Sequence, residues 1–202
     1  MPKIKLTKGE LKTQRDALKQ FSRFLPTLQL KKLQLQLETQ KSQERIENNK
    51  RKESEFKNNI TSWISMFGVL EEVQKIAKLI HILGTDTSLN NIAGVPIPVY
   101  TATRFKIDEY DLFYESPWID DATKAICALI EIRAERDILV EQYKRINDEL
   151  KVTTQRVNLF EKVKIPEAKE NIRKIQIYLG DQSTSAVGRS KIAKSKLAEA
   201  AL

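Results

Sequence analysis

The sequence predicts a fold dominated by α-helix, in which long N- and C-terminal helices pair as an antiparallel two-helix coiled coil. A small central region with a β-hairpin and short helices joins them. Glycine is absent between Gly9 and Gly68 and between Gly94 and Gly180, and both spans are rich in residues that favour helix. Both also carry heptad patterns of apolar residues, whereas the segment between them is rich in Gly, Pro and Thr. These three observations lead to the prediction.

The N-terminal half carries the first apolar seam. Two series of positions recur every seven residues and are offset from each other by three: Leu11, Leu18 and Leu25, and Phe21, Leu28 and Leu35. Alternating steps of three and four are typical of a coiled-coil seam. The stripe continues more sparsely to Phe67, and Pro26 predicts a local bend within it.

The C-terminal half carries the second seam, until its register breaks. Its positions are Ile132, Leu139, Ile146, Thr153 and Phe160, with Tyr143, Leu150 and Val157 four residues after three of them. Lys164 would come next, but a fresh apolar run starts one residue later and includes Ile165, Ala168, Ile172, Ile175 and Leu179. Pro166 at this point predicts a kink or a short interruption of the helix.

Two seams at opposite ends of one chain imply an antiparallel pairing, closed by the segment between them. A helix through either span would reach on the order of 80–90 Å, and a helix of that length needs a partner along it. The predicted seam consists of Leu18, Phe21, Leu25, Leu28, Leu35, Leu139, Ile146, Leu150, Val157, Phe160, Ile172, Ile175 and Leu179.

The stretch LQLKKLQLQLETQ (residues 28–40) has leucines at strand-like spacing inside this helical span. We interpret it as helix, because at about 100° per residue the leucines fall on two stripes. Leu28 and Leu35 join the seam. Leu30, Leu33 and Leu37 lie on nearly the opposite side, where a two-helix coil offers no mate. We expect this second stripe to contact a partner outside the coil.

The central segment divides the chain into an N-terminal helix (1–83), a hairpin and loop region (84–116) and a C-terminal helix with a basic tail (117–202). Within VPIPVYTATRFKI, residues 95–107, apolar and polar side chains alternate as in a strand, and its two prolines confine that strand to a sheet edge. YDLFY (110–114) is the candidate for the second strand. Helix then restarts at SPWIDD, where the serine fits an N-cap and the proline the first helical position.

Charge and composition exclude several classes of protein. The net charge of +8 lies within residues 1–60, which hold 15 Lys/Arg and 7 Asp/Glu, while the last twenty residues form a basic tail. No apolar run approaches the roughly 20 residues that span a bilayer, and the basic N-terminus lacks the apolar core of a secretory signal. The single cysteine excludes an internal disulfide and fits a reducing compartment. We therefore expect a soluble intracellular chain.

No pattern of residues predicts catalysis. Neither a Gly-x-x-x-x-Gly-Lys-Ser/Thr loop nor a glycine-rich dinucleotide turn is present. His81, the single histidine, fits a packed position on a helix, and Cys127 fits a small buried side chain. Asp120 and Asp121 fit the first turn of a helix, where carboxylates are favoured. We predict no catalytic residue, no cofactor and no metal site.

The basic clusters leave a second class of function open. Lys50, Arg51 and Lys52 are adjacent, and the tail contains GRSKIAKSK, so phosphate binding would predict strongly salt-dependent association with DNA or RNA. Acidic residues are interleaved with the first cluster, as on a solvated helix face. We favour the solvated face and predict no nucleic-acid partner.

Three segments of the chain carry further motifs: RVNLFEKVKIPEAKENIRKIQIYLGDQ (156–182), IAGVPIPVY (92–100), and the N-terminal KLTKGELKTQRDALKQF with LPTLQLKK. Together they resemble a known family, the D subunits of the V-type and A-type ATPases and ATP synthases. The first segment is the strongest match, through Arg156, Val157, Asn158, Ile165, Pro166, Ile172, Ile175 and Leu179. The second is similar to the family's Gly-Val-x-aliphatic-Pro segment. The third departs from the family's usual Pro-Thr start and keeps only part of its Leu-Lys-x-Lys-Arg motif.

The resemblance implies a central-stalk rotor shaft that transmits torque between a nucleotide-binding hexamer and a membrane ion-translocating ring. The implied partners are the catalytic and regulatory subunits of the hexamer, the small F subunit of the central stalk and the funnel subunit above the ring. The implied location is the inner face of the cell membrane, reached through the complex. The candidate hexamer contacts are Leu30, Leu33, Leu37, Arg189, Lys191, Lys194 and Lys196. A coiled-coil adaptor without a rotary role is the alternative that shares the same seams.

Overall fold

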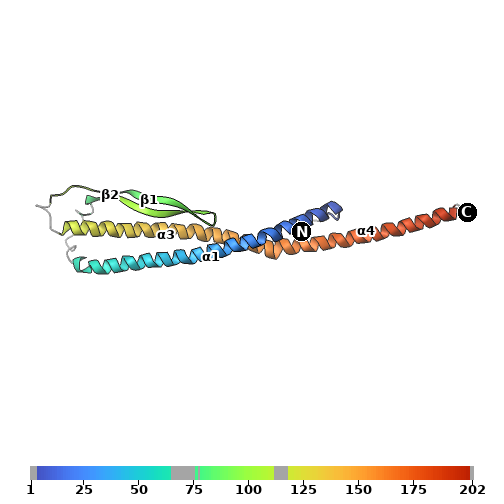
Figure 1. Cartoon of the computed structure of the whole chain (residues 1–202), viewed down its shortest axis with the longest axis horizontal. Coiled ribbons are helices and arrows are strands. Elements are labelled where there is room, and N and C mark those ends of the chain that lie inside the picture. Colours follow the sequence, from blue (N-terminus) through green and yellow to red (C-terminus); the bar gives the residue numbers. More distant parts are fainter. Residues whose placement is uncertain (1–3, 65–75, 77, 112–117, 201–202) are drawn as a thin grey trace. The chain divides into compact units, whose positions relative to one another are not determined.

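The computed structural model describes residues 4–64, 76, 78–111 and 118–200 (Figure 1). Three long helices dominate it: α1 (Lys8–Ile64), α3 (Ile119–Leu159) and α4 (Ile165–Ala200), with a π-helical turn, η2 (Phe160–Lys164), between the last two. Two strands, β1 (Ile80–Ile92) and β2 (Val95–Ile107), form one antiparallel sheet. The predicted fold class is therefore confirmed, as is the helical interpretation of LQLKKLQLQLETQ, which lies within α1.

The chain divides into two compact units. The first takes residues from both ends of the sequence, and the second takes its middle. One unit consists of Met1–Lys32 and Val152–Leu202, and the other of Leu33–Lys151. The second unit contains the hairpin together with parts of α1 and α3, while the first contains the start of α1, the end of α3, η2 and α4.

In the unit 33–151, α1 and α3 run antiparallel and are joined by polar side chains. The Gln43 amide donates to the Tyr143 hydroxyl at 3.2 Å, and the Asn49 amide donates to Glu135 Oε2 at 2.8 Å. Residue numbers thus rise on one helix as they fall on the other, which confirms the predicted direction of pairing.

Glu53 on α1 is the centre of a cluster of ion pairs between the two helices. The residue is 6% exposed, and its carboxylate lies 2.8 Å from Lys57 Nζ, 3.1 Å from Arg133 Nε and 2.5 Å from Arg136 Nη1. Hydrogen bonds from Lys57 and Arg133 lower the pKa of Glu53 against the opposing effect of burial. A buried carboxylate is stable only with such partners, so this cluster ties α1 to α3 at one register.

The hairpin packs on this helix pair through its second strand (Figure 1). Val95 and Ile97 of β2 form a buried core with Leu35 of α1 and Ile146 of α3. The turn has positive φ at Ala93 (52°) and Gly94 (82°), as in the type I′ turns that match the twist of two-residue hairpins. The strand predicted around residues 95–101, with its edge prolines, is confirmed.

Two predictions about the centre of the chain are wrong. β1 begins at Ile80, so helix does not extend to residue 83 and His81 lies on a strand. β2 pairs with β1 and not with YDLFY, of which Tyr110 and Asp111 are not in a strand and the rest lies outside the described residues. The predicted N-cap and first helical position at residues 116 and 117 also lie outside them. Gly and Thr residues obscured the alternation of β1, and its bulges at Ile82/Gly84 and Asp86/Thr87 shift its register.

In the other unit, the start of α1 packs against η2. The rings of Phe21 and Phe160 lie 5.1 Å apart between centroids, with an interplanar angle of 43°, a favourable tilted arrangement. Val157, Ala168 and Ile175 are buried, and the apolar residues of α1 at seam spacing from Leu11 to Leu28 are half-buried. The helix runs through Pro26 without a break.

The π-helical turn η2 explains why the seam changes phase at Lys164. The Ile165 N–H donates to the Phe160 carbonyl, so this turn contains one residue more than an α-helical turn. The apolar run beyond it is displaced by one residue from the heptads before it, which is the displacement that an added residue produces. Lys164 is therefore exposed, while Ala168 and Ile175 are buried.

Pro166 explains why the π-helical turn η2 lies directly before it. A proline inside a helix lacks an N–H and its ring crowds the carbonyl four residues earlier. A wider turn directly before the proline relieves that contact, and single π-turns occur where such a residue enters a helix. The predicted interruption is thus a local insertion that keeps the helix continuous and its apolar face on the seam.

Deletion of Lys162 together with Pro166→Ala is expected to leave the protein folded, because η2 becomes an ordinary α-helical turn and the seam beyond it stays aligned. Insertion of one alanine after Lys162 is the matched control. It rotates Ala168, Ile172 and Ile175 by about 100° away from the seam, at a cost of about 1.5–3 kcal/mol for each large side chain exposed. Thermal unfolding followed by circular dichroism compares the two. A deletion that destabilises as much as the insertion would contradict this explanation.

Glu53→Gln is expected to destabilise the protein by about 1–3 kcal/mol at pH 7, because it removes a charged acceptor from three donors. The folded pKa of Glu53 lies below its unfolded value. The stabilisation is therefore fully present above the ordinary glutamate pKa and is lost as the pH falls through the folded value. Urea unfolding at pH 7 and pH 3 measures the difference from wild type, which should shrink at pH 3. Glu141→Gln, which alters the exposed pair with Arg145, is the control and should change stability by less than about 1 kcal/mol.

Candidate functional site

The predicted seam residues all lie on buried or half-buried positions. Leu35, Ile146, Val157 and Ile175 are buried. The remaining members are half-buried: Leu18, Phe21, Leu25, Leu28, Leu139, Leu150, Phe160, Ile172 and Leu179. Their burial agrees with the heptad spacing that singled them out, and the opposite faces of the helices are largely exposed.

Sequence reasoning missed the polar part of the seam. Ser42 and Asn49 follow Leu35 at intervals of seven residues, and both are buried, as is Glu53. The Ser42 hydroxyl and Asn49 Oδ1 have no hydrogen-bond partner among the described residues. Continuing the Leu28–Leu35 interval through polar positions would have identified Ser42 and Asn49, but an apolar-only pattern could not.

The second leucine stripe of α1 is exposed. The exposed fractions are 57% for Leu30, 62% for Leu33 and 53% for Leu37, whereas Leu35 between them is fully buried. Steps of three and four along one helix bring the three leucines to one face. Single exposed leucines are ordinary, but three on one face are typical of a surface that another protein covers.

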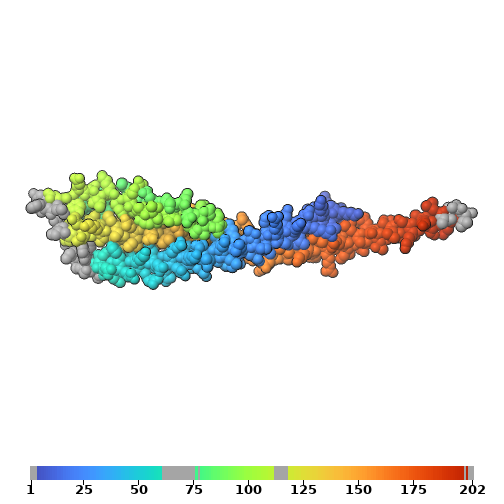
Figure 2. All heavy atoms as spheres, viewed as in Figure 1, coloured from blue at the N-terminus to red at the C-terminus, as the bar shows by residue number. Residues whose placement is uncertain are grey.

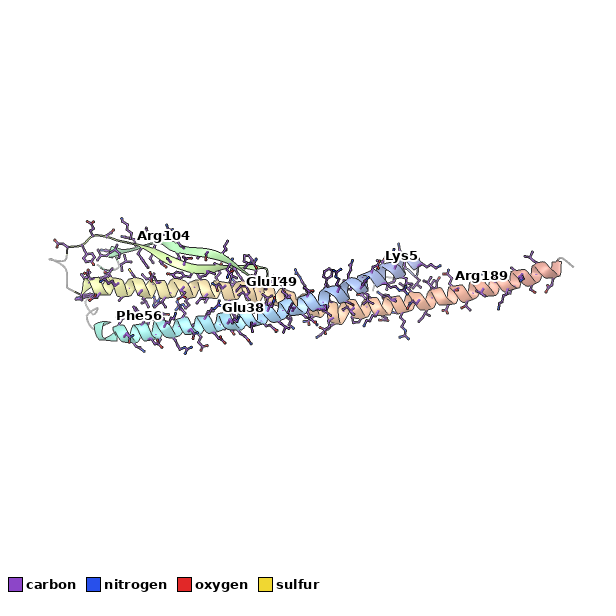
Figure 3. All side chains as sticks on the ribbon, in the orientation of Figure 1. Lys5, Glu38, Phe56, Arg104, Glu149 and Arg189 are labelled. Carbon is purple, nitrogen blue, oxygen red and sulfur yellow. The ribbon has the colours of Figure 1, made fainter. Side chains whose placement is uncertain are left out.

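The C-terminal part of α4 is the second exposed surface. All described residues from Gly180 to Leu197 are exposed, and Figure 3 shows Arg189 on a stretch of α4 beyond Lys5, with no other helix of this unit beside it. α1 begins at Lys8, so its antiparallel pairing through Phe21 and Phe160 ends before this stretch. The stretch carries Arg189, Lys191, Lys194 and Lys196, together with exposed Val187, Ile192 and Leu197.

The third exposed surface is the outer strand of the hairpin, whose atoms lie on the face drawn in Figure 2. Ile82, Leu83 and Leu89 of β1 are all more than half exposed. His81 Nε2 lies 2.9 Å from Asp108 Oδ2 at the base of the hairpin, and this contact lowers the pKa of the Asp108 carboxyl. The strand therefore presents apolar side chains to the solvent, with its few charged groups paired.

The described part of the chain holds no arrangement typical of a catalytic centre. No group of three or more His, Cys, Asp or Glu side chains that could hold a metal ion occurs in it. Burial, followed by the charge of Glu131, raises the pKa of the half-buried Cys127 thiol, which disfavours the nucleophilic thiolate. Asp120 lies in the first turn of α3, as predicted, and accepts a hydrogen bond from the Tyr110 hydroxyl.

A groove between α1 and α3 in the unit 33–151 is strongly charged. Its volume is about 430 Å³, and its lining includes Arg45, Arg51, Lys52 and Glu55 of α1 and Glu135 of α3. These cations and carboxylates are interleaved, as on a solvated helix face.

None of the described helices is both long and apolar enough to cross a membrane.

Comparison with known proteins supports the resemblance seen in the sequence. The family model for the D subunit of ATP synthase matches residues 10–195. The D subunit of the V-type ATP synthase of Borreliella burgdorferi is 45% identical over 197 residues, covering 98% of this chain and 96% of its own length. The corresponding D subunit of Chlamydia pneumoniae is 30% identical over 194 residues, covering 96% and 93%, and that of Chlamydia muridarum is 29% identical with 96% of both chains covered.

These matches include the seams, the hairpin and nearly all of α4, so they extend over both units and not over one motif alone. The chain belongs to the family of ATP synthase D subunits.

Proposed function

We propose that this chain is the central-stalk rotor shaft of a V-type ATP synthase or ATPase. In that role it transmits torque between a hexamer of nucleotide-binding subunits and a membrane ion-translocating ring, and it catalyses no reaction itself. The observation that carries the proposal is the pair of antiparallel helices tied across by the Glu53 cluster, in a chain that matches the D-subunit family over nearly its whole length. The complex holds it at the inner face of the membrane.

A shaft must resist sliding of its helices, and the Glu53 cluster supplies that resistance. Sliding α3 by one heptad in one direction would bring Ile126 and Leu129 to the places of Arg133 and Arg136. Sliding it in the other direction would bring Val140 and Tyr143 there. Either register takes both arginines away from the buried carboxylate and leaves it only Lys57 of its own helix, and removing partners from a buried ion pair is strongly destabilising. The observed axial register of α1 and α3 is thus favoured over the registers displaced by one heptad.

The exposed basic end of α4 suits insertion into a ring of subunits. It extends beyond its helical partner and carries four cations among apolar side chains. Exposed ion pairs contribute only about 0–1 kcal/mol each, so such a surface can meet successive similar interfaces during rotation without binding one of them tightly. We propose that Arg189, Lys191, Lys194 and Lys196 face acidic groups of the hexamer.

The unit with the hairpin is the part of the chain that we assign to the partners outside the hexamer. We propose that it faces the membrane side, where it meets the small F subunit of the central stalk and the funnel subunit above the ring.

Co-expression with the subunits encoded beside this chain tests the assembly. Recovery of a stable pair with a protein of about 100 residues, which then docks into the nucleotide-binding hexamer, is the expected result. A lone homodimer that never joins the hexamer would instead identify a coiled-coil adaptor.

Reversal of charge at Lys191, Lys194 and Lys196 to Glu is expected to weaken the coupling of ATP hydrolysis to rotation several-fold in the reconstituted motor. Three attractive contacts become repulsive, and like charges placed against each other across an interface disfavour binding. Changing the same lysines to Arg keeps the charge and is the control. Single-molecule rotation and ATPase rates measure coupling. Equal coupling in the Glu and Arg variants would exclude an electrostatic role for this end of α4.

Changing Leu30, Leu33 and Leu37 together to Gln is expected to leave the isolated chain folded, because exposed substitutions change stability by about 0.5 kcal/mol or less each. Assembly with the hexamer should fall several-fold. Leu35→Gln is the matched control, because it buries an amide in the seam and should lower the unfolding free energy by several kcal/mol. Thermal unfolding and co-purification separate the two effects. An unfolded triple variant would show that this stripe packs inside the protein.

A further inference from the structure

The outer edge of β1 is an open row of backbone donors and acceptors. In an antiparallel pair, opposed residues alternate between those that exchange hydrogen bonds and those whose N–H and C=O groups point away. The register pairs Leu89 with Pro98 and Asn91 with Pro96. Because neither proline has an N–H, these pairs are the non-bonded kind, and the backbone groups of Leu89 point away from β2. Thr87, two residues earlier, points the same way.

The corresponding edge of β2 is already occupied. The Pro98 carbonyl accepts a hydrogen bond from Gln142 Nε2 at 2.5 Å, and the Pro96 carbonyl accepts one from Arg145 Nη1 at 3.3 Å. Both donors belong to α3. At Pro96 and Pro98, therefore, β2 has no free N–H and no free carbonyl to offer another strand.

No described segment of the chain protects the edge of β1 in this way. Among the described residues, the outward N–H of Asn91 bonds the Asn90 side-chain oxygen at 2.7 Å, but no bond reaches Leu89 or Thr87. Proteins blunt free edges with proline, lysine or a covering segment. β1 contains neither proline nor lysine, whereas β2 contains Pro96, Pro98 and Lys106. Leu89 is 78% exposed, so an apolar side chain stands beside the open backbone groups.

We propose that the edge of β1 receives an extended segment of another subunit, which adds a third strand to the hairpin. The open backbone row specifies an extended chain, because no other conformation matches its spacing of donors and acceptors. The segment is uncharged with apolar residues at alternate positions. β1 itself offers only Asp86, already paired with Arg104 at 3.0 Å, and His81, paired with Asp108. The inference rests on the proposed function only in taking the partner from the same complex.

Two variants at Leu89 separate strand addition from an ordinary side-chain contact. Leu89→Pro removes an outward N–H and fills the edge with a ring. It is compatible with the hairpin because that N–H does not bond β2. Leu89→Thr removes the apolar side chain but keeps the N–H and favours strand. Hydrogen exchange at Ser88 and Asn90, whose N–H groups face β2, verifies that the hairpin is intact in each full-length variant.

The experiment adds full-length wild type or variant to the other subunits of the complex and measures the concentration that gives half-maximal incorporation. We expect Leu89→Pro to raise this concentration about five- to tenfold, and Leu89→Thr to raise it less than threefold. Hydrogen exchange followed by mass spectrometry should show that peptides covering residues 87–91 of the wild type gain protection in the complex.

Three results would overturn the proposal. Equal losses for the two variants would indicate a side-chain contact without strand addition, and unchanged exchange in the complex would show that the edge stays open. A homodimer of the free chain that Leu89→Pro abolishes, with no protection in the complex, would identify a second copy as the occupant. Rotational coupling measured on the same complexes tests the rotor function separately, so either idea can fail while the other stands.

Discussion

The structure depends on burial of one side of α1 against antiparallel helical partners. A helix of 57 residues gains little from propensity, and in water most of its stability comes from packing an apolar face. In the unit 33–151 that packing centres on Leu35 and Ile146 with the hairpin, and in the other unit on Phe21 and Phe160. The exposed side chains of these helices are thereby presented on a stiff support, as the proposed torque-transmitting role requires.

Two features would destabilise a simple coiled coil, and in each case another feature of the structure offsets the loss. Ser42, Asn49 and Glu53 are polar residues at buried positions of α1, and the ion pairs of Glu53 give that stretch a specific register in exchange for apolar burial. Pro166 interrupts the hydrogen bonding between α3 and α4, and the added residue of η2 returns the apolar run to the seam. Both solutions preserve the alignment of side chains across the helix pairs at some local cost.

The sequence was sufficient to predict features that recur at fixed spacing. The two long helices, their direction of pairing and the β2 strand followed from heptads, alternation and the edge prolines. β1 was missed because glycine and threonine mask its pattern and because bulges change which residues face the helices. The Glu53 cluster was missed because its partners lie about eighty residues away in the chain, so no local pattern connects them. Long-range polar contacts of this kind follow only from the pairing register.

The exposed surfaces differ in the chemistry that they offer, and this difference is an argument for different partners. The end of α4 offers cations on long side chains, which suit contacts that are repeatedly made and broken because screened charge pairs are weak. The leucine stripe offers apolar area on a rigid helix. The edge of β1 offers directional backbone groups, and several such bonds formed together hold a partner in one geometry. A rotor needs transient contacts where it turns against a stator and permanent ones where it joins other rotating subunits. The basic helix end therefore fits the first role, and the open strand edge fits the second.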